Sequence, residues 1–101
     1  MPHADPPDMI EAPEHLVADT RSAFRRAALA SLDAALVAHH DRIDIDLSRT
    51  REIDSSGLGV LVLLQKRASD AHVAMRLRNT PRSVRQLLTR THLDALFVFE
   101  D

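Results

Sequence analysis

The sequence predicts an α/β domain, because strand-like and helix-like patterns alternate along most of its 101 residues. Residues 43–47 (Ile-Asp-Ile-Asp-Leu) alternate strictly between apolar and charged side chains, as a half-buried strand does. Residues 58–64 are apolar apart from one glycine, which indicates a helix packed on a sheet. Residues 73–78 alternate again, as a second strand. From this order we expect a small mixed β-sheet with helices packed on one face.

The N-terminal region predicts little regular structure. Residues 1–9 hold three prolines and two aspartates, and we expect a flexible tail here, ahead of a single domain over residues 10–101. Only residues 9–12 could supply a strand before the first helix. The strand region at this end of the domain is therefore expected to be short.

The remaining elements follow from apolar spacing and capping. Phe24, Ala28 and Leu32 recur at helical intervals. Thr80 and Pro81 suit the N-cap and the first position of a later helix. The expected elements are a helix from Glu14 or Asp19 to Ala38, a helix from Gly57 to Ser69, a helix from Pro81 to Leu88, a turn over residues 93–96 and a last strand over residues 97–99.

Composition excludes several classes of protein. The chain has no cysteine, so disulfides, thiolate metal sites and cysteine nucleophiles are excluded. A net charge of −2 and the absence of Trp and Tyr argue against a nucleic-acid partner. No apolar run is long enough to span a membrane, and residues 1–13 are acidic and proline-rich where a signal peptide is basic and then apolar. We therefore expect a cytoplasmic domain without membrane contact.

Most charged side chains are expected to face solvent. Residues 51–101 are locally basic, through Arg76, Arg78, Arg82, Arg85 and Arg90, and an acidic patch on a protein partner is the alternative reason for this charge.

Two acidic residues could suggest acid–base chemistry, and six histidines could suggest a metal site, but both sets are better explained as surface or helix-end residues. Asp44 and Asp46 share one strand face and are expected to be solvated. The six histidines lack metal-ligand spacing, so we expect them at helix ends or on the surface and expect no metal site.

The segment Asp54-Ser55-Ser56-Gly57 lies between the predicted strand and the apolar helix. Asp and Ser are favoured N-caps, because their oxygens accept hydrogen bonds from the unpaired N–H groups of the first turn. By local chemistry alone, the segment is a strand-to-helix turn in which glycine allows a tight bend. A helix N-terminus also attracts phosphate, so a phosphoryl group could be accommodated at the same place.

The order of these elements closely resembles the STAS domain of bacterial anti-sigma factor antagonists (anti-anti-sigma factors). The resemblance runs from about Ile43 to Phe99. It is carried by the Ile-Asp-Leu-Ser of residues 45–48, the Asp-Ser-Ser-Gly-Leu-Gly-Val-Leu of residues 54–61, the Lys-Arg-Ala of residues 66–68, the strand over residues 73–78 and the helix over residues 81–88. It implies a STAS-like fold and a non-enzymatic protein-interaction domain that regulates transcription in bacteria.

The resemblance also implies a mechanism, partner switching. In the proteins that this chain resembles, a GHKL-type serine kinase that is also an anti-sigma factor phosphorylates the second serine of the motif. The unmodified antagonist binds that kinase and frees the sigma factor, and a PP2C-type phosphatase restores the unmodified form. Carried over to this sequence, the phosphoprotein is modified at Ser56, with Ser55 as the second choice. The residues implied to bind the partner are Asp54, Ser55, Ser56, Gly57 and Leu58.

The sequence departs from this family at its N-terminus, where relatives usually begin with a β-hairpin. One edge strand is therefore expected to be missing or shortened, which would leave a sheet edge available for a homodimer.

Two other functions remain open. The chain could be a constitutive STAS scaffold subunit of a lipid-transport or stress-signalling complex, docking a partner without modification. It could also be a small nucleotide-binding module that uses the helix N-terminus at Gly57. However, Gly57 and Gly59 come without the third glycine and the lysine of phosphate-binding loops. The sequence also lacks a G-x-S-x-G elbow, so we expect no cofactor and no catalytic residue.

Overall fold

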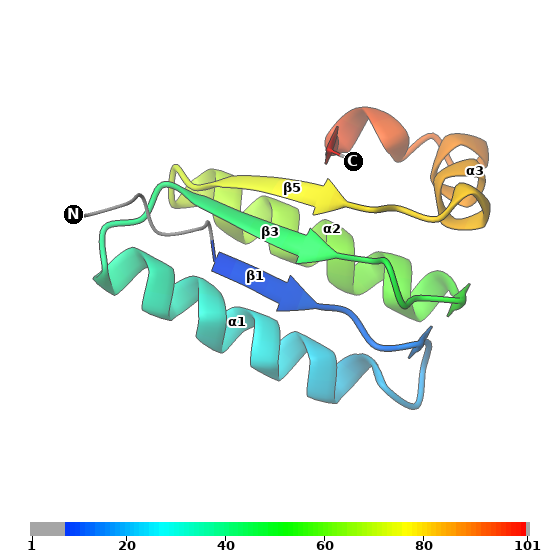
Figure 1. Cartoon of the computed structure of the whole chain (residues 1–101), viewed down its shortest axis with the longest axis horizontal. Helices are drawn as coiled ribbons and strands as arrows, with labels where there is room; N and C mark the ends of the chain where they lie inside the picture. The colour runs from blue at the N-terminus through cyan, green and yellow to red at the C-terminus, as the bar shows by residue number, and fades with distance from the viewer. Residues whose placement is uncertain (1–7, 101) are drawn as a thin grey trace.

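Strands and helices alternate along residues 8–100, the part of the chain that the computed structural model describes (Figure 1). In chain order the elements are β1 (Asp8–Glu11), β2 (His15–Leu16), α1 (Arg21–Val37), β3 (Arg42–Asp46), β4 (Glu52–Ile53), α2 (Ser55–Asp70), β5 (Ala74–Arg78), α3 (Arg82–Arg90), a short 3₁₀-helix η1 (Asp94–Leu96) and β6 (Val98–Glu100). Four strands form one sheet in the order β1-β3-β5-β6, and β2 pairs with β4 in a second, small sheet.

All pairs of neighbouring strands in the described chain are parallel. Parallel neighbours need a long crossover, and here α1, α2 and α3 each lie in the connection between two neighbouring strands of the large sheet. The expected α/β architecture is thus confirmed. The expectation of a mixed sheet is wrong for these strands, because no hairpin joins two neighbours.

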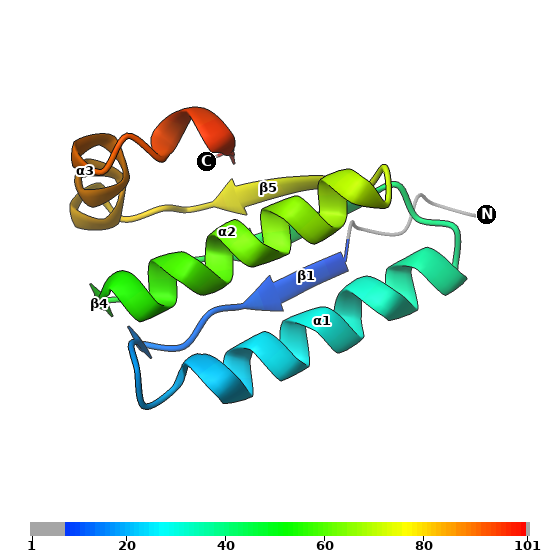
Figure 2. The ribbon, with the colours of Figure 1, turned by 180° about the vertical axis from the view of Figure 1, so that it is seen from behind.

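The helices α1 and α2 lie side by side on one face of the large sheet (Figures 1 and 2). The residues whose regular spacing predicted a helix are the buried residues of α1. Together with inward side chains of the strands they form the core, which includes Phe24, Ala28, Leu32, Ile43, Ile45, Leu61, Leu64, Met75 and Leu77. The third helix, α3, lies beyond the C-terminal end of β5 and does not cover either face of the large sheet (Figure 1).

The opposite face of the sheet carries a network of ion pairs. Asp44 is fully buried, and its carboxylate accepts hydrogen bonds from Arg42 (Nε at 3.0 Å and Nη2 at 3.1 Å) and from Arg78 (Nη1 at 3.2 Å). Glu100 accepts hydrogen bonds from Arg42 at 2.9 Å and from Arg76 at 2.7 Å. The expectation that Asp44 is solvated is therefore wrong, because arginine stems and guanidinium groups cover it. Arg76 and Arg78, which the sequence placed in a solvated basic region, belong to this network.

The N-terminal boundaries differ from the expected ones. The strand β1 begins at Asp8, so the last two residues of the predicted tail are in the sheet, and residues 1–7 of that tail lie outside the described residues. Helix α1 begins at Arg21, later than expected, because His15–Leu16 forms β2 instead of a first helical turn.

Two helix starts also differ. Helix α2 begins at Ser55, two residues before Gly57, because Asp54 is its N-cap. The expected N-cap at Thr80 is wrong: Pro81 holds that position, and the Thr80 hydroxyl is buried without a hydrogen-bond partner.

Each α-helix within residues 8–100 is followed, two residues after its last helical residue, by a histidine in the left-handed backbone region, where glycine is usual. His39, His72 and His92 have φ angles of 59°, 60° and 60°. The amide after each histidine donates to the carbonyl five residues earlier, which closes a Schellman motif: His40 to Ala35 (2.9 Å), Val73 to Ala68 (2.8 Å) and Leu93 to Leu88 (2.9 Å). The expected helix-end location is confirmed for these three histidines.

Candidate functional site

Asp54 joins the starts of α1 and α2. Its backbone is extended, and its Oδ1 accepts a hydrogen bond from the Gly57 N–H at 3.0 Å, which caps α2. Its Oδ2 accepts a second hydrogen bond, from the Ala18 N–H at 3.1 Å, in the loop before α1. The bond from Gly57, helped by that from Ala18, holds the pKa of the Asp54 carboxyl below its usual range, against a weaker opposing effect of burial. One carboxylate thus fixes both helix starts.

Gly57 lies where α2 passes closest to the small sheet. A Cβ atom at this residue would stand 2.1 Å from the Leu16 carbonyl oxygen and 2.9 Å from Ile53 Cγ1. Gly57 and its neighbour Leu58 are both buried, so neither can present a side chain to a partner. The partner-binding set therefore stays a prediction, in which Gly57 and Leu58 could contribute only by supporting the residues around them. The Gly57 N–H is already bonded to Asp54, which also weakens the nucleotide-binding alternative.

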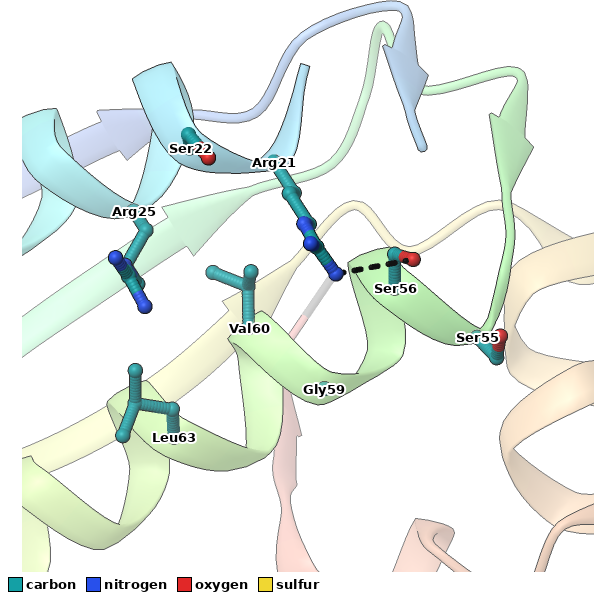
Figure 3. Close-up of a pocket in the computed structure, with 8 residues that line it drawn as sticks. All are labelled: Arg21, Ser22, Arg25, Ser55, Ser56, Gly59, Val60 and Leu63. Carbon is teal, nitrogen blue, oxygen red and sulfur yellow. Dashed lines mark hydrogen bonds between the residues drawn. The ribbon is translucent and has the colours of Figure 1, made fainter. Parts of the chain in front are cut away.

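Ser55 and Ser56 are the first two residues of α2. Ser55 is exposed and Ser56 is half-buried. The Arg21 guanidinium of α1 points at Ser56, with Nη1 3.5 Å from Oγ (Figure 3). The Ser55 side chain points away from that guanidinium (Figure 3). The predicted phosphorylation site, Ser56, and the second choice, Ser55, therefore have different surroundings.

A pocket of about 460 Å³ lies between the first turns of α1 and α2 (Figure 3). Its lining residues are Arg21, Ser22, Arg25, Ser55, Ser56, Gly59, Val60 and Leu63. The two charged side chains among them are both arginines, and a guanidinium donates hydrogen bonds but does not take up a proton. The pocket is thus suited to bind an anion rather than to activate a serine.

Sequence reasoning missed Arg21 and Arg25. A signal was available, because α1 begins with an arginine and its first turn contains no acidic residue. Cations are disfavoured at a helix N-terminus, so such a start suggests that these side chains serve another purpose. Their position beside Ser56 could not be read from the sequence, since Arg21 and Ser56 are 35 residues apart.

No helix within residues 8–100 combines the length and hydropathy that crossing a bilayer requires.

Comparison with solved structures finds the same fold in several proteins. A "putative anti-sigma factor antagonist" from Thermotoga maritima has a TM-score of 0.77 at 25% identity, over 99% of this chain and 85% of that one. A sulfate transporter family protein from Wolinella succinogenes has a TM-score of 0.72 at 16% identity, over 91% of this chain and 75% of that one. SpoIIAA, a Bacillus cell fate determinant solved in its phosphorylated form, has a TM-score of 0.66 at 16% identity, over 92% of this chain and 81% of that one.

The two likenesses at 16% identity establish the fold alone. A search of curated proteins gives no match. A family model described as "Mlab, STAS domain" matches residues 3–98, which contain every element of the large sheet except the last residues of β6. The resemblance that the sequence motifs suggested is confirmed: the chain belongs to the STAS domain family.

Proposed function

We propose that this chain is an anti-sigma factor antagonist that acts by partner switching, as an interaction domain and not as an enzyme. It binds an anti-sigma factor, itself a GHKL-type serine kinase, while Ser56 is unphosphorylated, and phosphorylation of Ser56 releases it. A PP2C-type phosphatase restores the binding form. The observation that carries this proposal is the position of Ser56 on the rim of a cationic pocket at the start of α2.

A phosphorylated serine needs a fold that tolerates the new charge. Phosphoserine carries about −1.5 to −2 charges at neutral pH and three acceptor oxygens. At the second residue of α2 this charge faces the positive end of the helix dipole, which favours it. The domain should therefore stay folded after modification. The phosphorylated SpoIIAA has the same overall fold.

Release of the partner then follows from charge and bulk at the surface. The partner-binding surface is proposed to consist of Asp54, Ser55 and Ser56, above the buried Gly57 and Leu58. A phosphate in that surface stands next to the Asp54 carboxylate, and a partner that accommodates one negative charge meets two or three. Misplaced like charge in an interface costs several kcal/mol.

The direct test is phosphorylation by the cognate kinase with ATP, followed by mass spectrometry. One phosphate is expected on the wild-type chain and on Ser55→Ala, which is the matched control, and none on Ser56→Ala. In calorimetric titration with the kinase, the phosphorylated chain should bind about a hundredfold more weakly or worse than the unmodified chain. Phosphate on another residue, or equal affinity of both forms, contradicts the proposal.

A constitutive STAS scaffold subunit, of a lipid-transport or a stress-signalling complex, is the second candidate. The observation in its favour is the description of the matched family model, which names Mlab. Under this alternative the same surface docks a partner permanently, and Ser56→Ala binds that partner as tightly as the wild-type chain does. A partner complex that persists in the presence of ATP would distinguish it from the switch.

The proposed setting is the bacterial cytoplasm, with no direct contact to membrane or nucleic acid.

The strand β1 pairs with only one neighbour among the described strands, β3. Pairing of two such edges would give a homodimer, which light scattering on the purified chain would detect as a doubled mass.

A further inference from the structure

We propose that Arg21 and Arg25 of α1 form an intramolecular clamp that binds the phosphoryl group carried by Ser56. The inference rests on the proposed function, because it takes Ser56 as the phosphorylated residue. It adds where the phosphate goes and which groups hold it.

The geometry at Arg21 is the first argument. The distance of 3.5 Å from Nη1 to Ser56 Oγ is at the long limit of a hydrogen bond, so the guanidinium is directed at the hydroxyl without binding it tightly (Figure 3). A phosphate on Oγ extends toward the guanidinium. Charge-assisted bonds of about 2.7–2.9 Å to its oxygens then need only a small adjustment of two surface side chains.

Arg25 lies one turn further along α1. Residues four positions apart share a helix face, and Arg25 lines the same pocket as Arg21 and Ser56. The pocket of about 460 Å³ has room for a phosphoryl group and its remaining hydration, since one water occupies about 30 Å³. In Figure 3 the Arg25 guanidinium lies nearer to Val60 and Leu63 than to Ser56, so its flexible side chain must turn toward residue 56 to reach a phosphate there. After that turn, two forked guanidinium groups can bind one phosphate.

Neither Arg21 nor Arg25 forms an ion pair within the part of the chain that the structure describes. Among residues 8–100, no carboxylate lies within 4.0 Å of either Arg21 or Arg25. Five arginines of the described chain do have such a partner, whereas Arg26, Arg67, Arg82 and Arg90 lack one there as well; what distinguishes Arg21 and Arg25 is that they line the pocket beside Ser56. The paired arginines are Arg42, Arg49, Arg51, Arg76 and Arg78.

The charges at the starts of α1 and α2 also favour an anion beside Arg21. The first turns of α1 and α2 contain no acidic residue, and Arg21 is the first residue of α1. Cations at the positive end of a helix oppose the dipole, so Arg21 is unfavourable there, although the Asp54 carboxylate already lies against the loop before α1. A phosphate on Ser56 would add further negative charge beside Arg21 and at the start of α2, and both positions favour it. Departures from a local rule of this kind are expected at functional residues.

The clamp gives phosphorylation a second effect on a partner. Without phosphate, Arg21 and Arg25 are available to carboxylates of a bound protein. With phosphate, the same guanidinium groups are occupied within the chain. Modification thus removes two cations from the binding surface at the same time as it adds negative charge.

The test uses the full chain with phosphoserine placed at residue 56 by genetic encoding, so no kinase or partner is needed. The second pKa of the phosphate, ordinarily about 6, is followed by ³¹P NMR. In the wild-type background it should lie about 0.5 to 1 below its value in Arg21→Ala, with Arg25→Ala in between. Arg26→Ala is the matched control, because Arg26 is exposed on the same helix and does not line the pocket.

Equal phosphate pKa values in the Arg21→Ala and Arg26→Ala backgrounds would overturn the clamp. Circular dichroism verifies that each variant is folded, and Arg21→Gln replaces Arg21→Ala if the latter does not fold. Saturable binding of added inorganic phosphate to the unmodified chain, without any effect of Arg21 on phosphoserine, would also overturn it, in favour of a site for a free anion.

This result is separable from that of the kinase assay. If Arg21 has no effect on the phosphate pKa, the clamp is refuted, but the proposed switch is not, because the switch is measured as affinity for a partner. If no kinase modifies Ser56, the proposed function is refuted, even if genetically encoded phosphoserine is bound by the clamp.

Discussion

The two glycines of α2 allow the same substitution to be made at two nearby positions with opposite expected results. Both lie within α2, and neither has a positive φ, so the backbone itself does not require glycine at either position. A Cβ at Gly57 would stand 2.1 Å from the Leu16 carbonyl oxygen, whereas a Cβ at Gly59 meets no atom within 4 Å. Alanine at residue 57 should therefore destabilise the domain, and alanine at residue 59 should stabilise it.

The magnitudes follow from the obstacle at each position. At residue 57 the start of α2 must move away from β2 by about 0.9 Å to reach a contact of 3.0 Å, and the atom in the way belongs to the backbone. Overpacking costs about 1–3 kcal/mol, and a rigid obstacle puts Gly57→Ala near 3 kcal/mol. At residue 59 the substitution removes the entropic cost of glycine in a helix, a gain of about 0.5–1 kcal/mol.

The assay is urea unfolding followed by far-UV circular dichroism, because the chain has no Trp or Tyr to serve as a fluorescent probe. The two variants should differ by about 3 to 4 kcal/mol in unfolding free energy, with similar m-values. A Gly57→Ala variant within about 0.5 kcal/mol of wild type would refute the close packing of α2 on β2. So would a Gly59→Ala variant that is destabilised as much as Gly57→Ala.

Asp44, Asp54 and the histidines that follow the helices are the subjects of three further predictions. Asp44→Ala should lower the unfolding free energy by about 2–3 kcal/mol, less than for a wholly buried pair because the two arginines stay partly exposed; an unchanged urea midpoint would contradict this. The lowered pKa of Asp54 means that its stabilisation is complete above the unfolded pKa of about 3.9 and is lost as the pH falls through the folded value. Urea unfolding between about pH 2.5 and 7 should therefore show a shallower acid loss in Asp54→Asn, which keeps the cap; equal slopes would argue against it. Glycine in place of His39, His72 or His92 should raise the unfolding free energy by about 0.5–1 kcal/mol each in the same assay, whereas alanine, which keeps the Cβ, should give no such gain.

The fold was largely predictable because the informative patterns are local. The alternation in residues 43–47 predicted a strand and the apolar run of residues 58–64 a helix packed on the sheet, and β3 and α2 confirm both elements. Strand direction was not predictable in the same way. It depends on whether a connection is a hairpin or a helical crossover, and the sequence placed a possible strand at residues 9–12 without showing how it pairs.

The surroundings of individual charged residues were not predicted correctly from the sequence. Alternation correctly puts Asp44 on the face opposite Ile45, but it cannot tell what covers that face. The cover comes from Arg78, 34 residues away, on the neighbouring strand. The approach of Arg21 to Ser56 is of the same kind, since it depends on how α1 packs against α2. Both are contacts between elements, and a pattern within one element does not contain them.

The small sheet of β2 and β4 has a consequence for motion. Each of its strands leads into one of the two helices that flank the pocket. The pairing covers two residues of each strand, and further backbone bonds join Arg51 and Glu52 to the Glu14 carbonyl, at 2.8 and 3.2 Å, and Asp54 to the Leu16 carbonyl, at 3.3 Å. While these bonds hold, the first turns of α1 and α2 move as one body. When they open, the helix starts separate, without any need to disturb the central strands β3 and β5. Amide protons of residues 51–54 should therefore exchange with solvent by local opening, well before those of β3, and ligands that hold the two helix starts together should slow that exchange.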